Sequence, residues 1–206
     1  MPNKPKEIHQ YASLPMLLTD LQLLEDMERK VAWNLGQYLE SAEFGVIAPL
    51  LVAYTSIDYC IAVISYRDWI ITKWLTLATH GRPPEVPDGP ETVSKASFQA
   101  WLNRNISYLQ FCQEIANTAK HGEYADKETL RDPAAQSRLW LTEQGKAACE
   151  AMTPDQKWQY AAKHPRECSF DRALYAKGYA EPIKASQVLH LPFEELRSFA
   201  ALHGIR

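Results

Sequence analysis

The sequence predicts an all-α fold, a helical bundle of about four helices with a C-terminal helical extension. Two observations carry this prediction: apolar residues recur at spacings of three and four over long segments, and strand-like alternation is sparse. Hydrophobic residues make up 46% of the 206 residues and charged residues 23%, which is ample for a folded core. We expect the bundle core over residues 1–125 and, over residues 126–206, an extension that packs on it without being a clearly independent domain.

Two long helices open the predicted bundle, after a lead-in of residues 1–12. Apolar periodicity predicts the first helix over Leu14–Ser41. Pro49 suits the first turn of the second helix, which we expect over Pro49–His80 before a proline-rich loop of residues 81–93. One face of this second helix mixes polar with apolar residues, and buried polar groups need partners, so we expect that face to contact another element. Its members are Leu51, Tyr54, Asp58, Ile61, Ser65, Asp68, Trp69 and Thr72.

A third helix is predicted from Ser94–Ser97 to His121, with a break near Asn105. Beyond it the pattern is weaker. The expected elements are a charged loop over residues 123–133, helices over Ala134–Met152, Thr153–Lys163 and Pro192–His203, and a short extended segment over Ser186–Leu191.

Composition narrows the classes of function. The net charge of −3 and pI near 6.1 argue against broad electrostatic coating of nucleic acid, although a local basic pocket remains compatible with them. The four cysteines include no CxxC pair, which disfavours a zinc ribbon or a redox motif. Cys149, His164 and Cys168 could approach a metal, but no fourth ligand is evident. We therefore expect neither a metal nor a cofactor.

The sequence favours a cytoplasmic protein. The lysines near the N-terminus precede no apolar segment of the kind a signal peptide needs. The run Val46–Tyr66 is long enough to cross a bilayer, but it carries Asp58 near its middle, where a charge is costly. A buried helix of a bundle explains this run better, so we expect no membrane span.

The most informative block is Ile115–Gly122, at the end of the third predicted helix. Asn117, Lys120 and His121 share one helical face because residues three and four positions apart are neighbours. Lysine and histidine followed by glycine are also typical of an ordinary helix end. The same side chains could equally hold a phosphate and move a proton, which are the parts needed for metal-free RNA cleavage. Both interpretations stay open.

The pairing of two segments resembles a known family. Residues 67–69 read RDW, and Glu114–His121 reads EIANTAKH. Together they resemble HEPN-type helical proteins of prokaryotes, and the resemblance covers residues 45–125. It implies a helical bundle that usually dimerises. Many members are metal-independent ribonucleases in toxin–antitoxin, abortive-infection and other phage-defence systems, while others have lost catalysis and serve as binding or assembly modules.

The chain departs from the active family motif in one respect. That motif has an arginine with four to six residues between it and the histidine, whereas this chain has Glu114, Ile115 and Ala116 there. The resemblance implies His121 as acid/base, with Asn117 and Lys120 binding phosphate. Lys120 or Arg67 could supply the missing cation. The further candidate substrate-binding residues are Arg67, Asp68, Arg104 and Asp58.

Three hypotheses follow. The first is a HEPN-like endoribonuclease or RNA-binding component of a toxin–antitoxin or phage-defence system, acting as a homodimer; whether it is an enzyme stays open. The second is a catalytically inactive interaction or regulatory module (accessory, antitoxin-like or phage-encoded) that binds a protein partner from the same operon. The third is a small-molecule sensor with its ligand near Asp58, Tyr54 and Trp69.

Overall fold

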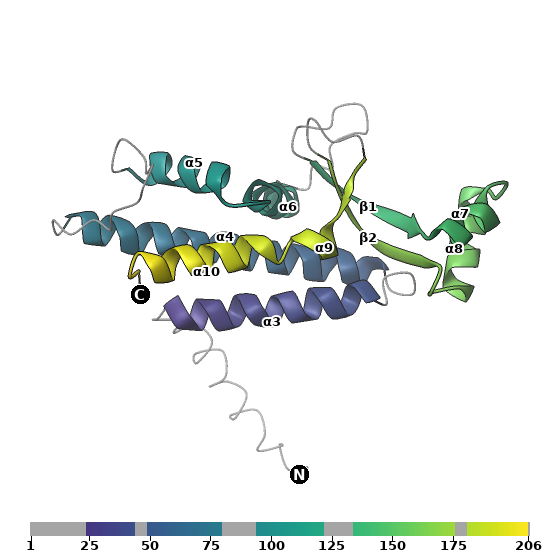
Figure 1. The fold of residues 1–206 in the computed structure, drawn as a ribbon, viewed down its shortest axis with the longest axis horizontal. Coiled ribbons are helices and arrows are strands. Elements are labelled where there is room, and N and C mark those ends of the chain that lie inside the picture. Colours follow the sequence, from purple (N-terminus) through teal and green to yellow (C-terminus); the bar gives the residue numbers. More distant parts are fainter. Residues whose placement is uncertain (1–23, 44–48, 80–93, 122–133, 176–180, 206) are drawn as a thin grey trace, which may run out of the picture.

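The computed structural model describes residues 24–43, 49–79, 94–121, 134–175 and 181–205. This part of the chain is predominantly helical, and a small three-stranded sheet stands at one end of the helices (Figure 1). The predicted fold class, a helical bundle, is thus confirmed. The predicted lead-in and the predicted loops of residues 81–93 and 123–133 lie outside the described residues.

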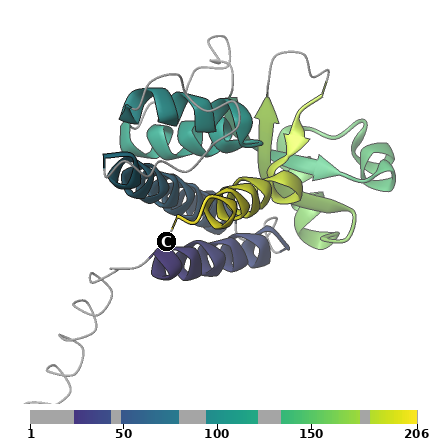
Figure 2. The same cartoon turned by 60° about the vertical axis from the view of Figure 1, so that its left-hand side comes forward.

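The helices form layers around one central helix. Figure 1 shows α3 on one side of α4 and α5 and α6 on the other, and Figure 2 keeps this order after a turn of the view. Helix α10 lies along α4 in both views. The bounds of these helices are α3 Leu24–Glu43, α4 Pro49–Thr79, α5 Lys95–Asn105, α6 Leu109–His121 and α10 Leu191–Leu202.

Helix α4 is the one described helix that is long and apolar enough, by length and composition alone, to cross a membrane. In the structure it packs among other helices, with Tyr59, Tyr66 and Ile70 fully buried. This central position fits the core helix of a soluble protein, as the sequence predicted.

The mixed face of α4 that we expected to contact another element is instead its more open face. Tyr54 is 61% exposed, and Asp58 is exposed as well. Its hydroxyl groups bind their own helix, because serine and threonine can donate to a carbonyl one turn back. The Oγ of Ser65 donates to the Ile61 carbonyl at 2.8 Å, for example. The expectation was therefore wrong for the polar residues of this face, including Asp68, whose carboxylate accepts from Arg67 of the same helix, while the partly buried Ile61 and Trp69 pack against the core.

The predicted start and break of the third helix are confirmed. Ser94 caps the N-terminus of α5 through a reciprocal pair of hydrogen bonds with Ser97. The helix ends at Asn105, and Tyr108 then adopts a left-handed backbone with φ of 58°, which redirects the chain into α6. The break turns the chain, so that α6 runs across the direction of α5 while both lie on α4 (Figure 1).

Residues 134–175 correct the sequence prediction. The segment predicted as one helix over Ala134–Met152 is strand β1 (Ala134–Leu141) followed by α7 (Glu143–Cys149). Strand β2 (Cys168–Tyr175) pairs antiparallel with β1 along its whole length. Alanine, glutamine, arginine and leucine favour a helix locally, but the ladder with β2 overrides that preference in β1.

The C-terminal segment returns to the bundle. A two-residue strand, β3 (Ile183–Lys184), pairs with β2, and the short helix α9 (Ala185–Val188) follows where the sequence predicted an extended segment. The ring of Phe199 on α10 then packs on Phe98 and Trp101, with centroids 5.9 and 5.6 Å apart. The predicted helices over Thr153–Lys163 and Pro192–His203 are observed as α8 (Pro154–Lys163) and α10.

A buried polar cluster attaches the sheet to the helices. Asp171 on β2 is fully buried and accepts hydrogen bonds from the Tyr38 hydroxyl on α3 at 2.6 Å and the Ser186 backbone N–H at 2.8 Å. Next to it, Arg172 Nε donates to Ser56 Oγ on α4 at 2.7 Å. Strand β2 is thereby fixed to both long helices.

Candidate functional site

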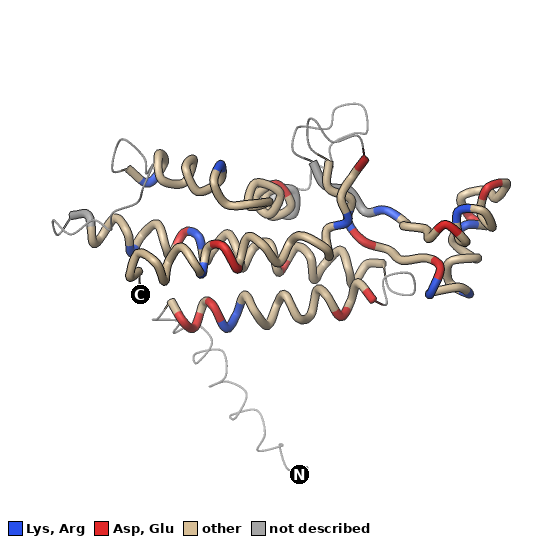
Figure 3. The backbone as a smooth tube through the Cα atoms, viewed as in Figure 1, with Lys and Arg blue, Asp and Glu red and all other residues tan. Residues whose placement is uncertain are grey.

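A buried guanidinium lies at the centre of the candidate site. Most of α4 carries no charge (Figure 3), but its Arg67 side chain is charged and only 3% exposed. Nε and Nη2 of Arg67 donate to Oδ1 of the adjacent Asp68 at 3.0 and 2.7 Å. The Asp68 side chain is 41% exposed, so its carboxylate both neutralises the guanidinium and reaches solvent.

The same guanidinium joins three helices. Nη1 of Arg67 donates to Oδ1 of Asn103 on α5 at 3.2 Å and to Oε1 of Gln113 on α6 at 2.6 Å. Four of the five N–H bonds of Arg67 are therefore directed at protein acceptors. This saturation leaves Arg67 little capacity to hold a phosphate directly.

The chain of hydrogen bonds continues to the predicted site. Nε2 of Gln113 donates to Oδ1 of Asn117, one turn further along α6, at 2.9 Å. The structure thus connects three predicted site residues: Arg67 binds Asp68 directly and is linked to Asn117 through Gln113. We refer to these four residues with Asn103 as the amide network.

Two members of the amide network, Asn103 and Gln113, were missed by the sequence analysis. Gln113 lies four positions before Asn117, and that spacing was a usable signal. The role of Asn103 depends on an arginine 36 positions away, so nothing local marks it.

The other predicted site residues lie apart from this network or outside the described residues. The backbone of Lys120 and His121 forms the last turn of α6, as predicted, but their side chains are outside the described part of the chain. Arg104, in the last turn of α5, and Asp58, on the open face of α4, are exposed. Neither forms a hydrogen bond or ion pair with the described residues.

Two thiols pack near the amide network. Cys60 and Cys112 are both fully buried. A hydrogen bond with Cys60, together with burial, raises the pKa of the Cys112 thiol well above its usual value, and the charge of Arg67 only partly opposes this. The Cys112 thiol therefore stays protonated near neutral pH and is a poor nucleophile.

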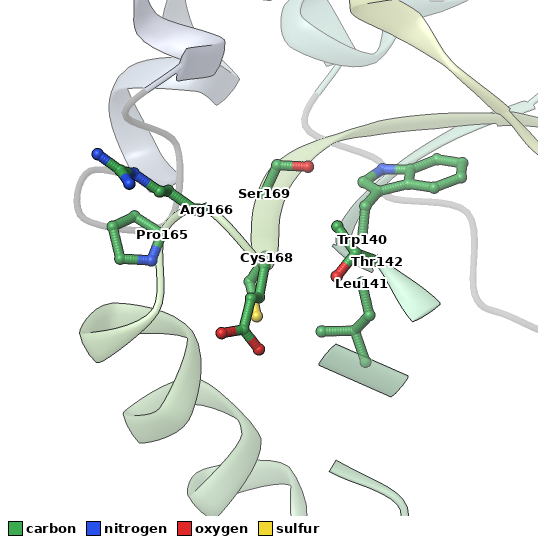
Figure 4. Close-up of a pocket in the computed structure, with 8 residues that line it drawn as sticks. Trp140, Leu141, Thr142, Pro165, Arg166, Cys168 and Ser169 are labelled. Atoms are coloured by element: carbon green, nitrogen blue, oxygen red, sulfur yellow. The ribbon is translucent and has the colours of Figure 1, made fainter. Parts of the chain in front are cut away.

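A cleft lies apart from the amide network, where β1 and β2 meet α8, and Figure 4 shows its lining. This cleft has a volume of about 200 Å³ and is lined by Trp140, Leu141, Thr142, Pro165, Arg166, Glu167, Cys168 and Ser169. Its acidic group is already engaged: Glu167 accepts a hydrogen bond from the Tyr160 hydroxyl and lies 3.5 Å from His164 Nδ1. Burial raises the pKa of the Cys168 thiol. The cleft thus offers neither a free base nor an activated nucleophile.

Within the described residues, no three His, Cys, Asp or Glu side chains gather closely enough to hold a metal ion. Comparisons with protein-family models, curated proteins and solved structures found no match for this chain. The HEPN resemblance therefore stays a prediction, and a proposal about function has to start from the amide network.

Proposed function

We propose that this protein is a cytoplasmic, HEPN-like protein that acts on RNA at the C-terminal end of α6. The observation that supports the proposal is the amide network, which leads from buried Arg67 to Asn117. Asn117 shares a helical face with Lys120 and His121, since they are three and four positions apart. An oriented amide beside an ammonium and an imidazole is a suitable set of groups for a phosphodiester.

In this proposal the cleavage step needs no metal ion. The 2′-oxygen of the RNA attacks the adjacent phosphorus, and the bond from phosphorus to the 5′-oxygen breaks. His121 takes the 2′-hydroxyl proton, and the leaving 5′-oxygen receives a proton from water. Lys120 and Asn117 hold the phosphate. Arg67 supports Asn117 through Gln113 and does not touch the substrate, which revises the substrate-binding role that the sequence suggested for it.

The proposal includes a homodimer. Three large apolar side chains are exposed near the start of α4: Leu50 is 68% exposed, Leu51 is 49% exposed and Tyr54 is 61% exposed. Such a group on a single chain favours association with another surface. A second copy of the chain would bury it.

The same apolar group supports a second candidate function, the catalytically inactive module that binds a protein partner from the same operon. The two candidates differ in whether RNA is processed. The third hypothesis, a small-molecule sensor, gains no support, because Tyr54, Asp58 and Trp69 are not among the residues that line the cleft in Figure 4.

The test is an RNA-cleavage assay in excess EDTA with three proteins: wild type, His121→Ala and the control His190→Ala. His190 is the N-cap residue that precedes α10, and its side chain makes no capping hydrogen bond. We expect wild type and His190→Ala to leave cyclic-phosphate ends on a mixed RNA panel, and His121→Ala to leave the RNA intact. Equal cleavage by His121→Ala, or no cleavage by any of the three, would overturn the enzymatic proposal.

A further inference from the structure

Arg67 fixes which atom of each neighbouring amide group, the oxygen or the nitrogen, faces it in the amide network. A guanidinium only donates hydrogen bonds, so each amide group that faces Arg67 must present its oxygen. Oδ1 of Asn103 and Oε1 of Gln113 both do so. Their nitrogen atoms therefore point away from the guanidinium.

This orientation is passed on to Asn117. Because Oε1 of Gln113 is held by Arg67, the group that Gln113 offers to Asn117 is its Nε2, a donor. Asn117 must therefore accept this hydrogen bond through its Oδ1, so its own Nδ2 points away from Gln113. Within the described residues, Nδ2 of Asn117 has no hydrogen-bond acceptor. Asn103, Gln113 and Asn117 are all half-buried, so their N–H groups can meet a ligand.

We propose that the side chains of Asn103, Gln113 and Asn117 form a donor-only binding surface for an oxyanion, with Arg67 as the positioning residue that sets its polarity. The inference rests on the proposed function for the source of the oxyanion, an RNA phosphate. The carboxylate within the network, Asp68, is neutralised by Arg67, because Oδ1 of Asp68 takes two of the guanidinium's hydrogen bonds. Glu114, three positions before Asn117 on α6, is itself engaged in an interaction.

One substitution separates this role from a purely structural one. Gln113→Glu keeps the shape of the side chain and can still accept from Arg67, but it cannot donate to Asn117. The bundle stays joined while Asn117 loses its fixed orientation. Gln110→Glu is the matched control, because it adds the same charge one turn earlier on α6, at an exposed residue.

The experiment measures the dissociation constant of a labelled single-stranded RNA oligonucleotide for wild type, Gln113→Glu and Gln110→Glu, with thermal melting as a check of folding. We expect Gln113→Glu to weaken binding at least about tenfold and Gln110→Glu by less than about threefold, since one hydrogen-bonding contact to an anion is worth roughly a factor of ten. Equal weakening by both variants would show that the added negative charge alone lowers the RNA affinity, and it would overturn the inference.

An NMR titration keeps the inference testable if wild type binds no RNA. The probe is inorganic phosphate, and the signals are the side-chain NH2 resonances of Asn103 and Asn117 in wild type and Arg67→Met. Phosphate-dependent shifts in wild type that are lost in Arg67→Met would support the donor-only surface even where the RNA proposal fails. Absence of shifts in wild type, or equal shifts in both proteins, would overturn it.

Discussion

Arg67 on α4 and Gln113 on α6 are joined by a 2.6 Å hydrogen bond across 46 positions of sequence. This bond connects the core of the bundle to the helix end that carries Asn117. A change at Arg67 should therefore affect both stability and the candidate site.

Replacing Arg67 by methionine should destabilise the fold. The variant leaves the oxygens of Asn103 and Gln113 without a donor in a half-buried setting, and each such group costs about 1–3 kcal/mol. We expect a combined loss of about 2 kcal/mol or more in the free energy of unfolding, measured by urea denaturation. Arg104→Met, at an exposed position of α5, should change it by less than about 0.5 kcal/mol. Equal effects of the two variants would contradict the structural role of Arg67.

Asp171→Ala should be more damaging than a typical substitution. It removes the acceptor of the Tyr38 hydroxyl and of the Ser186 backbone N–H, both in the core, so we expect a loss of about 3 kcal/mol or more. Asp58→Ala on the open face of α4 is the control, with an expected change below about 0.5 kcal/mol. Thermal melting of the two variants gives the comparison, and a loss below about 1 kcal/mol for Asp171→Ala would argue against the buried cluster.

Replacing either of two glycines by alanine should change the free energy of unfolding, with opposite signs at the two positions. A Cβ at Gly145 would lie 2.7 Å from the Glu167 carbonyl oxygen, a backbone atom that also accepts from the Thr142 N–H. We expect Gly145→Ala to destabilise by about 1–3 kcal/mol. Gly36 lies inside α3, and a Cβ added there would meet nothing within 4 Å, so Gly36→Ala should stabilise by about 0.5–1 kcal/mol. If denaturant unfolding shows that both substitutions stabilise the protein, or that both destabilise it, the surroundings described for these two glycines would be contradicted.

Alkaline pH should unfold the protein through its tyrosines. Burial raises the pKa of Tyr59 and Tyr66 above the ordinary value of 10.0, and the hydrogen bond to Glu167 raises that of Tyr160 to about 12. Above pH 10 the unfolded chain therefore loses these protons before the folded chain does, and the free energy of unfolding falls as the pH rises. Phenolate absorbance should rise in a late phase that coincides with loss of helical circular dichroism. A single phase near pH 10 with the helices intact would contradict this.

The elements that the sequence predicted well have strong local signals. The long helix α4, the Ser94 cap of α5 and the break after Asn105 depend on residues close together in the chain. Strand β1 does not, because its helix-favouring residues become extended only through pairing with β2.

Strand β2 was hidden for another reason. Nearly all of its residues are buried, including Asp171 and Arg172, so it lacks both the alternation and the apolar run that mark a strand. The residues of the candidate site also differ in whether the local sequence reveals their role. Asn117 was found from the spacing within α6, whereas the roles of Gln113 and Asn103 are set by contact with a distant arginine.

The affinity of Asn117→Asp for single-stranded RNA tests most directly whether phosphate binds at the end of α6. This substitution keeps the size of the side chain and replaces its outward N–H group by an acceptor. We predict that binding weakens at least about tenfold relative to wild type, with the fold retained and only a small fall in melting temperature from a negative charge near the C-terminal end of α6. RNA affinity equal to that of wild type would show that the end of α6 is not where phosphate binds.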